Sequence, residues 1–190
     1  IGEMSNFYFG MFTNKKICNS PSFIPERCNN RDKLKAFLSS FKELNVREET
    51  TCSFIKNELG LKCAVLKDPT LRLGSEKWNK LIKTNKFKRQ NYCFVYMLHK
   101  KERYESICAE LKDKDNISLF NSNSGNEGYL YSPVEFVALI RNSKEVITNS
   151  FHGACFASIF KKPLTIYKHN EPSDIRYDIF KDYSQLKNII

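Results

Sequence analysis

The stretch VITNSFHGA, residues 146–154, contains the end of a predicted strand, a polar turn and the start of a helix. Its pattern predicts a strand over residues 145–148, a turn over 149–153 and a helix over 154–160. In an open parallel sheet, ligands bind outside the carboxyl ends of the strands, where loops run into helix N-termini. This stretch is therefore the strongest candidate for a ligand site in the chain.

Several groups in this stretch suit an anionic ligand. Asn149 and Ser150 can cap the following helix, and we expect the backbone N–H groups at Gly153 and Ala154 to hold an oxyanion. Gly153 has no side chain, so a ligand can approach its backbone closely. The imidazole of His152 can donate to a phosphate or transfer a proton near neutral pH. A lone histidine is more often structural, and its position at a strand-to-helix turn is what favours a functional role.

Short strands and helices alternate along the chain, which predicts parallel α/β sheets. Residues 92–98 form a continuous apolar run, as expected for a central parallel strand buried on both faces. Ser132-Pro133-Val134-Glu135 has the pattern of a capping box and predicts a helix that ends near Asn142. Gly60 is placed to end a helix in the left-handed conformation. The other predicted strands are 6–12, 17–20, 43–46, 63–66, 117–120 and 163–167, and the other predicted helices are 31–41, 49–59, 76–82 and 101–111.

The 190 residues are enough for one domain or for two small ones that share a cleft. The polar, basic and aperiodic residues 85–91 separate two alternating patterns and are predicted to form a linker. We therefore expect a first unit at residues 1–84 and a second at residues 92–190.

The net charge of +10 is concentrated in the first half of the chain. Residues 1–90 contain 18 Lys and Arg against 9 Asp and Glu, whereas residues 91–190 contain 13 against 12. The excess is greatest over residues 77–89, which form either a solvated helix end and linker or a surface that attracts an anionic polymer or membrane. No nucleic-acid-binding motif accompanies the charge, so no nucleic acid is expected as a partner.

The cysteines and the apolar pattern indicate the expected compartment. The seven cysteines include no CxxC pair, which argues against a disulfide framework or a zinc site and is typical of a reducing cytosol. No run approaches a membrane span, and the first ten residues do not resemble a secretory signal. We expect a cytoplasmic protein without a metal or cofactor. Because the chain does not begin with Met, we also expect residues upstream of it.

Other polar side chains follow predicted strands and are weaker candidates. Arg47 could act as a bidentate anion clamp or pair with its neighbours at the surface. Asp68 could orient a hydroxyl or end its strand through an Asx turn. Arg176 is a candidate anion contact, and His99 could line the cleft or pack as a structural histidine. His169 has no distinguishing context.

Taken together, these segments resemble the polysaccharide pyruvyl transferase family over about residues 40–180. No single motif is diagnostic, but the ordered set, with TNSFHG followed by a strand that begins with Lys-Pro, is fairly specific. The residues that carry the resemblance are 46–48, 68–71 with Trp78, 94–98, 132–136, 146–156 and 160–164.

The resemblance implies a transferase with Rossmann-like parallel sheets and two lobes of the GT-B type, active in exopolysaccharide assembly. It would move the pyruvyl unit of phosphoenolpyruvate onto two hydroxyls of a glycan or lipid-linked sugar as a cyclic ketal, releasing phosphate. His152 would be the phosphate contact or general acid, and Arg47 and Arg176 the anion clamps. Ser150, Gly153 and Ala154 would contact the substrate.

The glycine-rich first strand, loop and helix of such relatives have no counterpart here, so we expect an incomplete first lobe. Two alternatives remain open. One is a GT-B glycosyltransferase with a nucleotide-sugar donor, for which Glu127 or Glu135 would bind the ribose. The other is a non-catalytic remnant whose basic face binds an anionic glycan.

Overall fold

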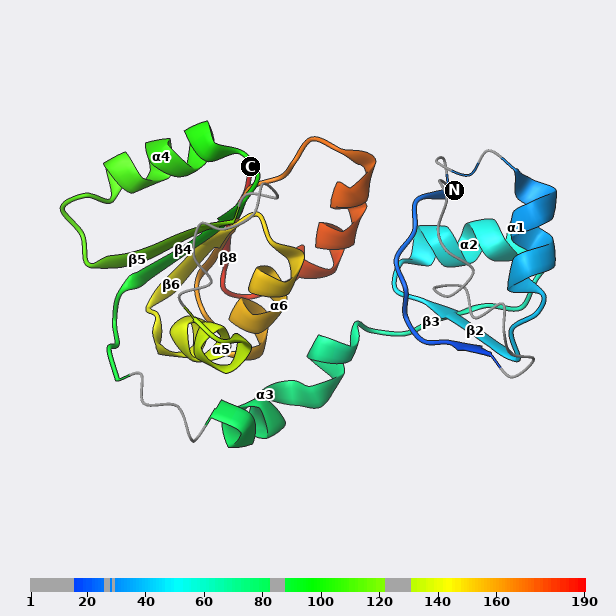
Figure 1. Cartoon of the computed structure of the whole chain (residues 1–190), viewed down its shortest axis with the longest axis horizontal. Coiled ribbons are helices and arrows are strands. Elements are labelled where there is room, and N and C mark those ends of the chain that lie inside the picture. The colour runs from blue at the N-terminus through cyan, green and yellow to red at the C-terminus, as the bar shows by residue number, and fades with distance from the viewer. Residues whose placement is uncertain (1–15, 26–27, 29, 83–87, 122–130) are drawn as a thin grey trace. The chain divides into compact units, whose positions relative to one another are not determined.

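The computed structural model describes residues 16–25, 28, 30–82, 88–121 and 131–190 (Figure 1). The chain divides into two compact units, Ile1–Pro69 (unit 1) and Thr70–Ile190 (unit 2). Both units contain parallel sheets with helical connections, so the chain has a mixed α/β architecture consistent with a Rossmann-like fold. None of the helices in the described residues is long and apolar enough to cross a membrane.

Unit 1 contains a three-stranded parallel sheet in the order β1-β2-β3. Its elements are β1 (Ile17–Cys18), α1 (Arg31–Leu38), β2 (Glu43–Val46), α2 (Glu49–Asn57) and β3 (Ala64–Val65). The apolar faces of α1 and α2 pack on β2 in a core that includes Leu34, Val46 and Ile55. These elements confirm the predicted alternation, and Gly60 has the expected positive φ of 67°. The strand predicted over residues 6–12 lies outside the described residues.

Unit 2 contains a five-stranded parallel sheet in the order β5-β4-β6-β7-β8. Its strands are β4 (Cys93–Leu98), β5 (Asn116–Asn121), β6 (Glu145–Thr148), β7 (Leu164–Ile166) and β8 (Leu186–Ile189). Numbered from β4, this order is 2-1-3-4-5, a doubly wound arrangement. The chain leaves β4 in one direction toward β5 and continues from β6 in the other, so the topological switch point lies between β4 and β6. Ligands bind at this position in open α/β sheets.

Helices cover both faces of this sheet, with α4 (Lys101–Glu110) on one side and α5 (Pro133–Asn142) and α6 (Phe151–Ile159) on the other (Figure 1). Alternate residues of β4 pack on opposite faces of the sheet. Cys93, Val95 and Met97 pack with α4, while Phe94, and Tyr92 just before the strand, pack in the core shared with α5 and α6. This explains the continuous apolar run, because β4 is buried on both sides.

Two of these helices begin where local side chains can cap them. The predicted capping box of α5 is present: Glu135 N donates to Ser132 Oγ at 3.3 Å, and Ser132 N donates to the Glu135 carboxylate at 2.7 Å. Ser150 caps α6, so that helix begins at Phe151 and not at Ala154 as predicted. His152 and Gly153 therefore lie in the first turn of α6 and not in the turn before it.

The helix α3 (Pro69–Ile82) is longer than the sequence predicted and contains a kink at Gly74, where φ is 68° and ψ is 167°. The predicted helix over residues 76–82 is only its second half. Ile82, Trp78 and Leu71 pack with the main core of unit 2. The units thus divide at Pro69, earlier than the linker expected at residues 85–91.

The C-terminal region contains two elements that the sequence did not predict, the 3-10 helix η2 (Pro172–Phe180) and the edge strand β8. Tyr177 and Phe180 of η2 are buried in the core of unit 2. The central residues of β8, Lys187 and Asn188, are exposed, so β8 lacks the apolar pattern of the inner strands.

Burial of β4 predicts that the Cys93 thiol resists alkylation in the folded protein. Cys93 is 0% exposed, and burial, with a smaller effect of the Glu145 carboxylate, raises its pKa to about 12. The nucleophilic thiolate is therefore scarce at pH 8. Iodoacetamide labelling followed by mass spectrometry should modify the half-buried Cys28 and Cys108 well before Cys93, and all seven cysteines in denaturant. Equal native rates for Cys93 and Cys108 would contradict this packing.

Candidate functional site

The carboxamide of Asn149 joins the ends of the two strands at the switch point. Its Oδ1 accepts from Leu98 N at 2.6 Å, and its Nδ2 donates to Leu98 O at 2.8 Å. Leu98 is the last residue of β4, and Asn149 directly follows β6. Asn149 is 1% exposed, so these bonds are shielded from water and hold the two strand ends at a fixed separation.

The backbone of Asn149 is held from the other side by the C-terminal region. Its carbonyl oxygen accepts from Tyr177 Oη and lies 2.9 Å from His169 Nε2. Burial is the main cause that raises the pKa of Tyr177 to about 12, so the phenol remains a donor across the physiological range. Asp174 accepts from His169 N and so supports this turn from η2. The C-terminal region, including η2, therefore positions the turn before α6.

The first amides of α6 donate within the helix. Gly153 N donates to Ser150 Oγ at 3.2 Å, and Ala154 N donates to Ser150 O at 2.9 Å. The Ser150 amide in turn donates to Thr148 Oγ1 at 3.0 Å. The amides of Gly153 and Ala154, which were predicted to hold an oxyanion, thus both have acceptors in the Ser150 cap.

Gly153 is needed for packing at the start of α6. A Cβ at this position would lie 2.8 Å from Thr148 Oγ1 and 3.3 Å from Ser150 Cβ. Thr148 Oγ1 is itself fixed, because it donates to Tyr96 O at 2.7 Å. The glycine therefore lets α6 begin directly against the end of β6.

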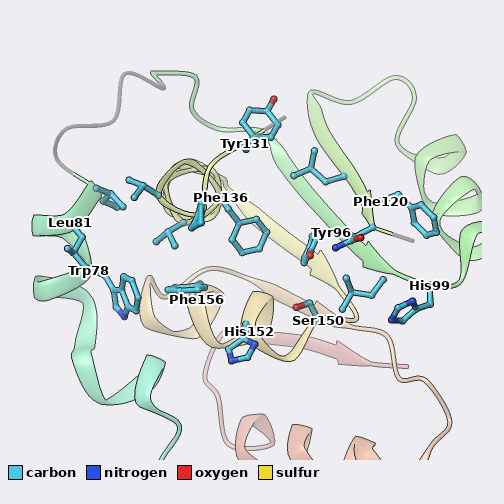
Figure 2. A pocket seen from close by; sticks show the side chains of 17 residues that line it. Trp78, Leu81, Tyr96, His99, Phe120, Tyr131, Phe136, Ser150, His152 and Phe156 are labelled. Carbon is cyan, nitrogen blue, oxygen red and sulfur yellow. The ribbon is translucent and has the colours of Figure 1, made fainter. Parts of the chain in front are cut away.

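A cavity of about 650 Å³ opens on the α5 and α6 face of the sheet, beside the switch point (Figure 2). Polar side chains lie where the strands end: His99 after β4, Asn121 at the end of β5, and Ser150 and His152 after β6. Aromatic and aliphatic side chains from α3, α5, α6, β4 and β5, together with Tyr131 before α5, line the rest of the described wall. The lining residues are Trp78, Leu81, Ile82, Tyr96, Leu98, His99, Leu119, Phe120, Asn121, Tyr131, Pro133, Val134, Phe136, Val137, Ser150, His152 and Phe156.

Three of the predicted polar residues therefore meet at one cavity. His152 is exposed on the first turn of α6, while Ser150 is 6% exposed and lines the same wall. His99 also lines the cavity, which was one of the two positions predicted for it. Its φ of 58° is unusual for a non-glycine residue. His99 N donates to Asn121 O at 3.1 Å, so this backbone conformation is tied to the neighbouring strand.

Arg176 reaches the start of α6 from η2. Its guanidinium carbon lies 5.9 Å from the ring centre of Phe151 and 5.3 Å from that of Tyr177, as in cation–π pairs. Its Nε is buried and has no hydrogen-bond partner among the described residues. A positive charge thus lies against Phe151, the residue next to His152.

Arg47 and Asp68 belong to unit 1, where they form an ion pair at the ends of β2 and β3. Arg47 Nη1 lies 2.7 Å from Asp68 Oδ2, and the Asp68 side chain is only 4% exposed. Glu48, the next residue, is also buried. The predicted role of Arg47 as an anion clamp is weakened, because its charge is neutralised within unit 1. Asp68 pairs with this arginine, an arrangement the sequence did not predict.

The structure does not support Glu135 as a ribose ligand of a glycosyltransferase, and it does not describe Glu127. The Glu135 carboxylate accepts from the Ser132 amide, which lowers its pKa, so it acts as a helix cap. Glu127 lies outside the described residues. Within the part of the chain that the structure describes, no cluster of three His, Cys, Asp or Glu side chains could hold a metal ion.

The sequence of the chain matches a known protein family. The family model for polysaccharide pyruvyl transferase matches residues 2–171 of the 190-residue chain. The chain therefore belongs to the polysaccharide pyruvyl transferase family, as the ordered motifs indicated. Searches of curated proteins and of solved structures gave no significant match.

Replacing Gly153 with Ala tests the packing at the start of α6. The new Cβ would overlap Thr148 Oγ1, and overpacking of this kind lowers the free energy of unfolding by about 1–3 kcal/mol. Urea denaturation of the single variants and of Thr148→Ala/Gly153→Ala measures the coupling. The Gly153→Ala penalty should shrink when Thr148 is already Ala, and an unchanged penalty would contradict the close approach.

Removing the positive charge of Arg47 tests its pairing with Asp68. Arg47→Gln leaves a buried carboxylate without its cation and should lower the unfolding free energy by roughly 2 kcal/mol, less than for a fully buried pair. Arg47→Gln/Asp68→Asn should regain part of this loss in urea denaturation. Additive losses in the double variant would argue against the pair.

Proposed function

We propose that the chain transfers a pyruvyl group from phosphoenolpyruvate to two hydroxyls of a sugar in a polysaccharide or its precursor. One sugar oxygen bonds to C2 of phosphoenolpyruvate while the methylene carbon C3 takes up a proton and becomes a methyl group. The second sugar oxygen then displaces phosphate from C2, and the two hydroxyl protons account for the new methyl hydrogen and the protonated phosphate. The product is a cyclic ketal.

The observation that carries this proposal is the meeting of His152, Ser150 and His99 at the switch point of a family member. The reaction needs a proton donor for C3 and positive groups for the departing phosphate. His152, which is exposed and lines the cavity, is the proposed general acid or phosphate contact. Its position on the first turn of α6 gives the site the positive end of the helix dipole.

The anionic groups of phosphoenolpyruvate need further partners beside this helix end. We assign the Ser150 hydroxyl, which lines the cavity, and the guanidinium of Arg176, which stacks on Phe151. Gly153 and Ala154 support this site through the helix cap and do not bind the anion through their amides. Arg47 is left out of the anion site, because Asp68 neutralises it.

The two units would then correspond to the two lobes of a GT-B transferase. This part of the proposal is supported by the parallel sheets of both units and by the switch point in unit 2. In such an arrangement, the phosphoenolpyruvate site belongs to unit 2. The polar side chains at the strand ends of unit 1, the partly exposed Arg47 and the buried Glu48 and Asp68, suit hydroxyl groups better than anions.

The proposal predicts phosphate release that depends on both substrates and on His152. The full chain, incubated with phosphoenolpyruvate and a panel of glycans, should release phosphate with at least one acceptor and add a pyruvyl mass to it. His152→Asn should lower kcat by at least about 100-fold, the usual contribution of a general acid.

Ser158→Ala, a change of a half-buried residue at the far end of α6, serves as the matched control and should retain the rate. Circular dichroism and melting temperature should show that both variants fold. No phosphate release with any acceptor, or a folded His152→Asn variant at the original rate, would overturn the proposal.

A further inference from the structure

The wall of the cavity in unit 2 is almost entirely apolar. Of the seventeen described residues that line it, thirteen are aliphatic, aromatic or proline, and none is Lys, Arg, Asp or Glu. The four polar ones, His99, Asn121, Ser150 and His152, all follow or end a strand. The cavity therefore has one polar edge and a large apolar interior.

Phosphoenolpyruvate matches only the polar edge. It carries a phosphate and a carboxylate, and burying such charges without cations or hydrogen-bond donors is strongly unfavourable. The volume of about 650 Å³ falls in the range of sites that enclose drug-sized ligands, so the interior has room for a second chemical group.

Edge-to-face aromatic contacts hold this interior in shape. Ring centres lie 4.9 Å apart for Trp78 and Phe156, 4.8 Å for Tyr96 and Phe136, and 6.4 Å for Phe136 and Phe156. Trp78 is further fixed because its Nε1 donates to Thr70 O at 2.9 Å. Figure 2 shows Trp78 and Leu81 at the opposite end of the cavity from His99 and Ser150.

We propose that this interior binds an apolar group attached to the acceptor sugar, with the sugar itself at the polar edge beside His152. The ligand is thus an amphiphile, with hydroxyls toward His99, Ser150 and His152 and an apolar portion toward Trp78 and Leu81. Its role as acceptor rests on the proposed function, whereas its binding does not.

Trp78 provides a direct readout, because it is the only tryptophan of the chain and lines the cavity. Paired n-octyl and methyl glycosides of glucose, galactose and mannose, below the micelle concentration, are titrated into the full chain without phosphoenolpyruvate. Each buried methylene contributes a factor of about 4 in affinity. The octyl glycosides should change the Trp78 emission saturably and bind at least tenfold more tightly than their methyl partners.

Two variants on α3 separate the cavity from the rest of the surface. Leu81→Glu places a charge at the apolar end, where Leu81 is already 55% exposed, and should weaken octyl glycoside binding at least tenfold. Leu73→Glu, at a 39% exposed position of the same helix outside the cavity, is the matched control and should bind normally. Val134→Glu, at the start of α5, repeats the test independently, because an acidic residue suits a helix N-terminus.

Equal affinities for octyl and methyl glycosides, or normal binding by folded Leu81→Glu and Val134→Glu variants, would overturn the inference. Phosphate release from phosphoenolpyruvate is measured separately on the same glycosides. Tight octyl binding without phosphate release supports the cavity and counts against the proposed function. Phosphate release with the same KM for octyl and methyl acceptors supports the proposed function and counts against binding of an apolar group in the cavity.

Discussion

The buried carboxamide of Asn149 is the constraint on which the site depends. It binds both backbone groups of Leu98, so the end of β6 stays beside the end of β4. The carbonyl of the same residue meets Tyr177 and His169, which ties the turn to the C-terminal region. α6 begins two residues later. These bonds therefore fix the position of its first turn, which carries His152. Loss of the carboxamide would leave buried backbone groups without partners and release the turn.

The site combines two chemistries that arise from different parts of the fold. The switch point supplies the polar groups, since loops after parallel strands meet at one edge of the sheet. The apolar interior comes from side chains that fill the space between the sheet and α3, α5 and α6. The proposed reaction, which joins an anionic donor to a sugar with an apolar substituent, needs both environments side by side.

The sequence predicted the elements whose signals are local. The apolar run of β4, the capping box of α5 and the glycine after α2 each depend on neighbouring residues, and all are present. The edge strand β8 was missed because two of its four side chains are exposed and polar, and only pairing with β7 makes it a strand. In the candidate site, too, the sequence predicted the residues with local signals and missed those that depend on long-range contacts. His152, Ser150 and His99 could be proposed from strand ends, whereas the pairing of Arg47 with Asp68 and the role of His169 depend on long-range contacts.

The most direct test of the central claim is an NMR titration of the chain, labelled with ¹³C and ¹⁵N at its three histidines, with phosphoenolpyruvate. The signals are assigned with single His→Asn variants. If the donor binds at the switch point between β4 and β6, the ring signals of His152 and His99 shift saturably, while that of His169, held against the Asn149 carbonyl, changes least. Phosphoenolpyruvate that binds by calorimetry yet leaves the His152 and His99 signals unchanged would contradict the account.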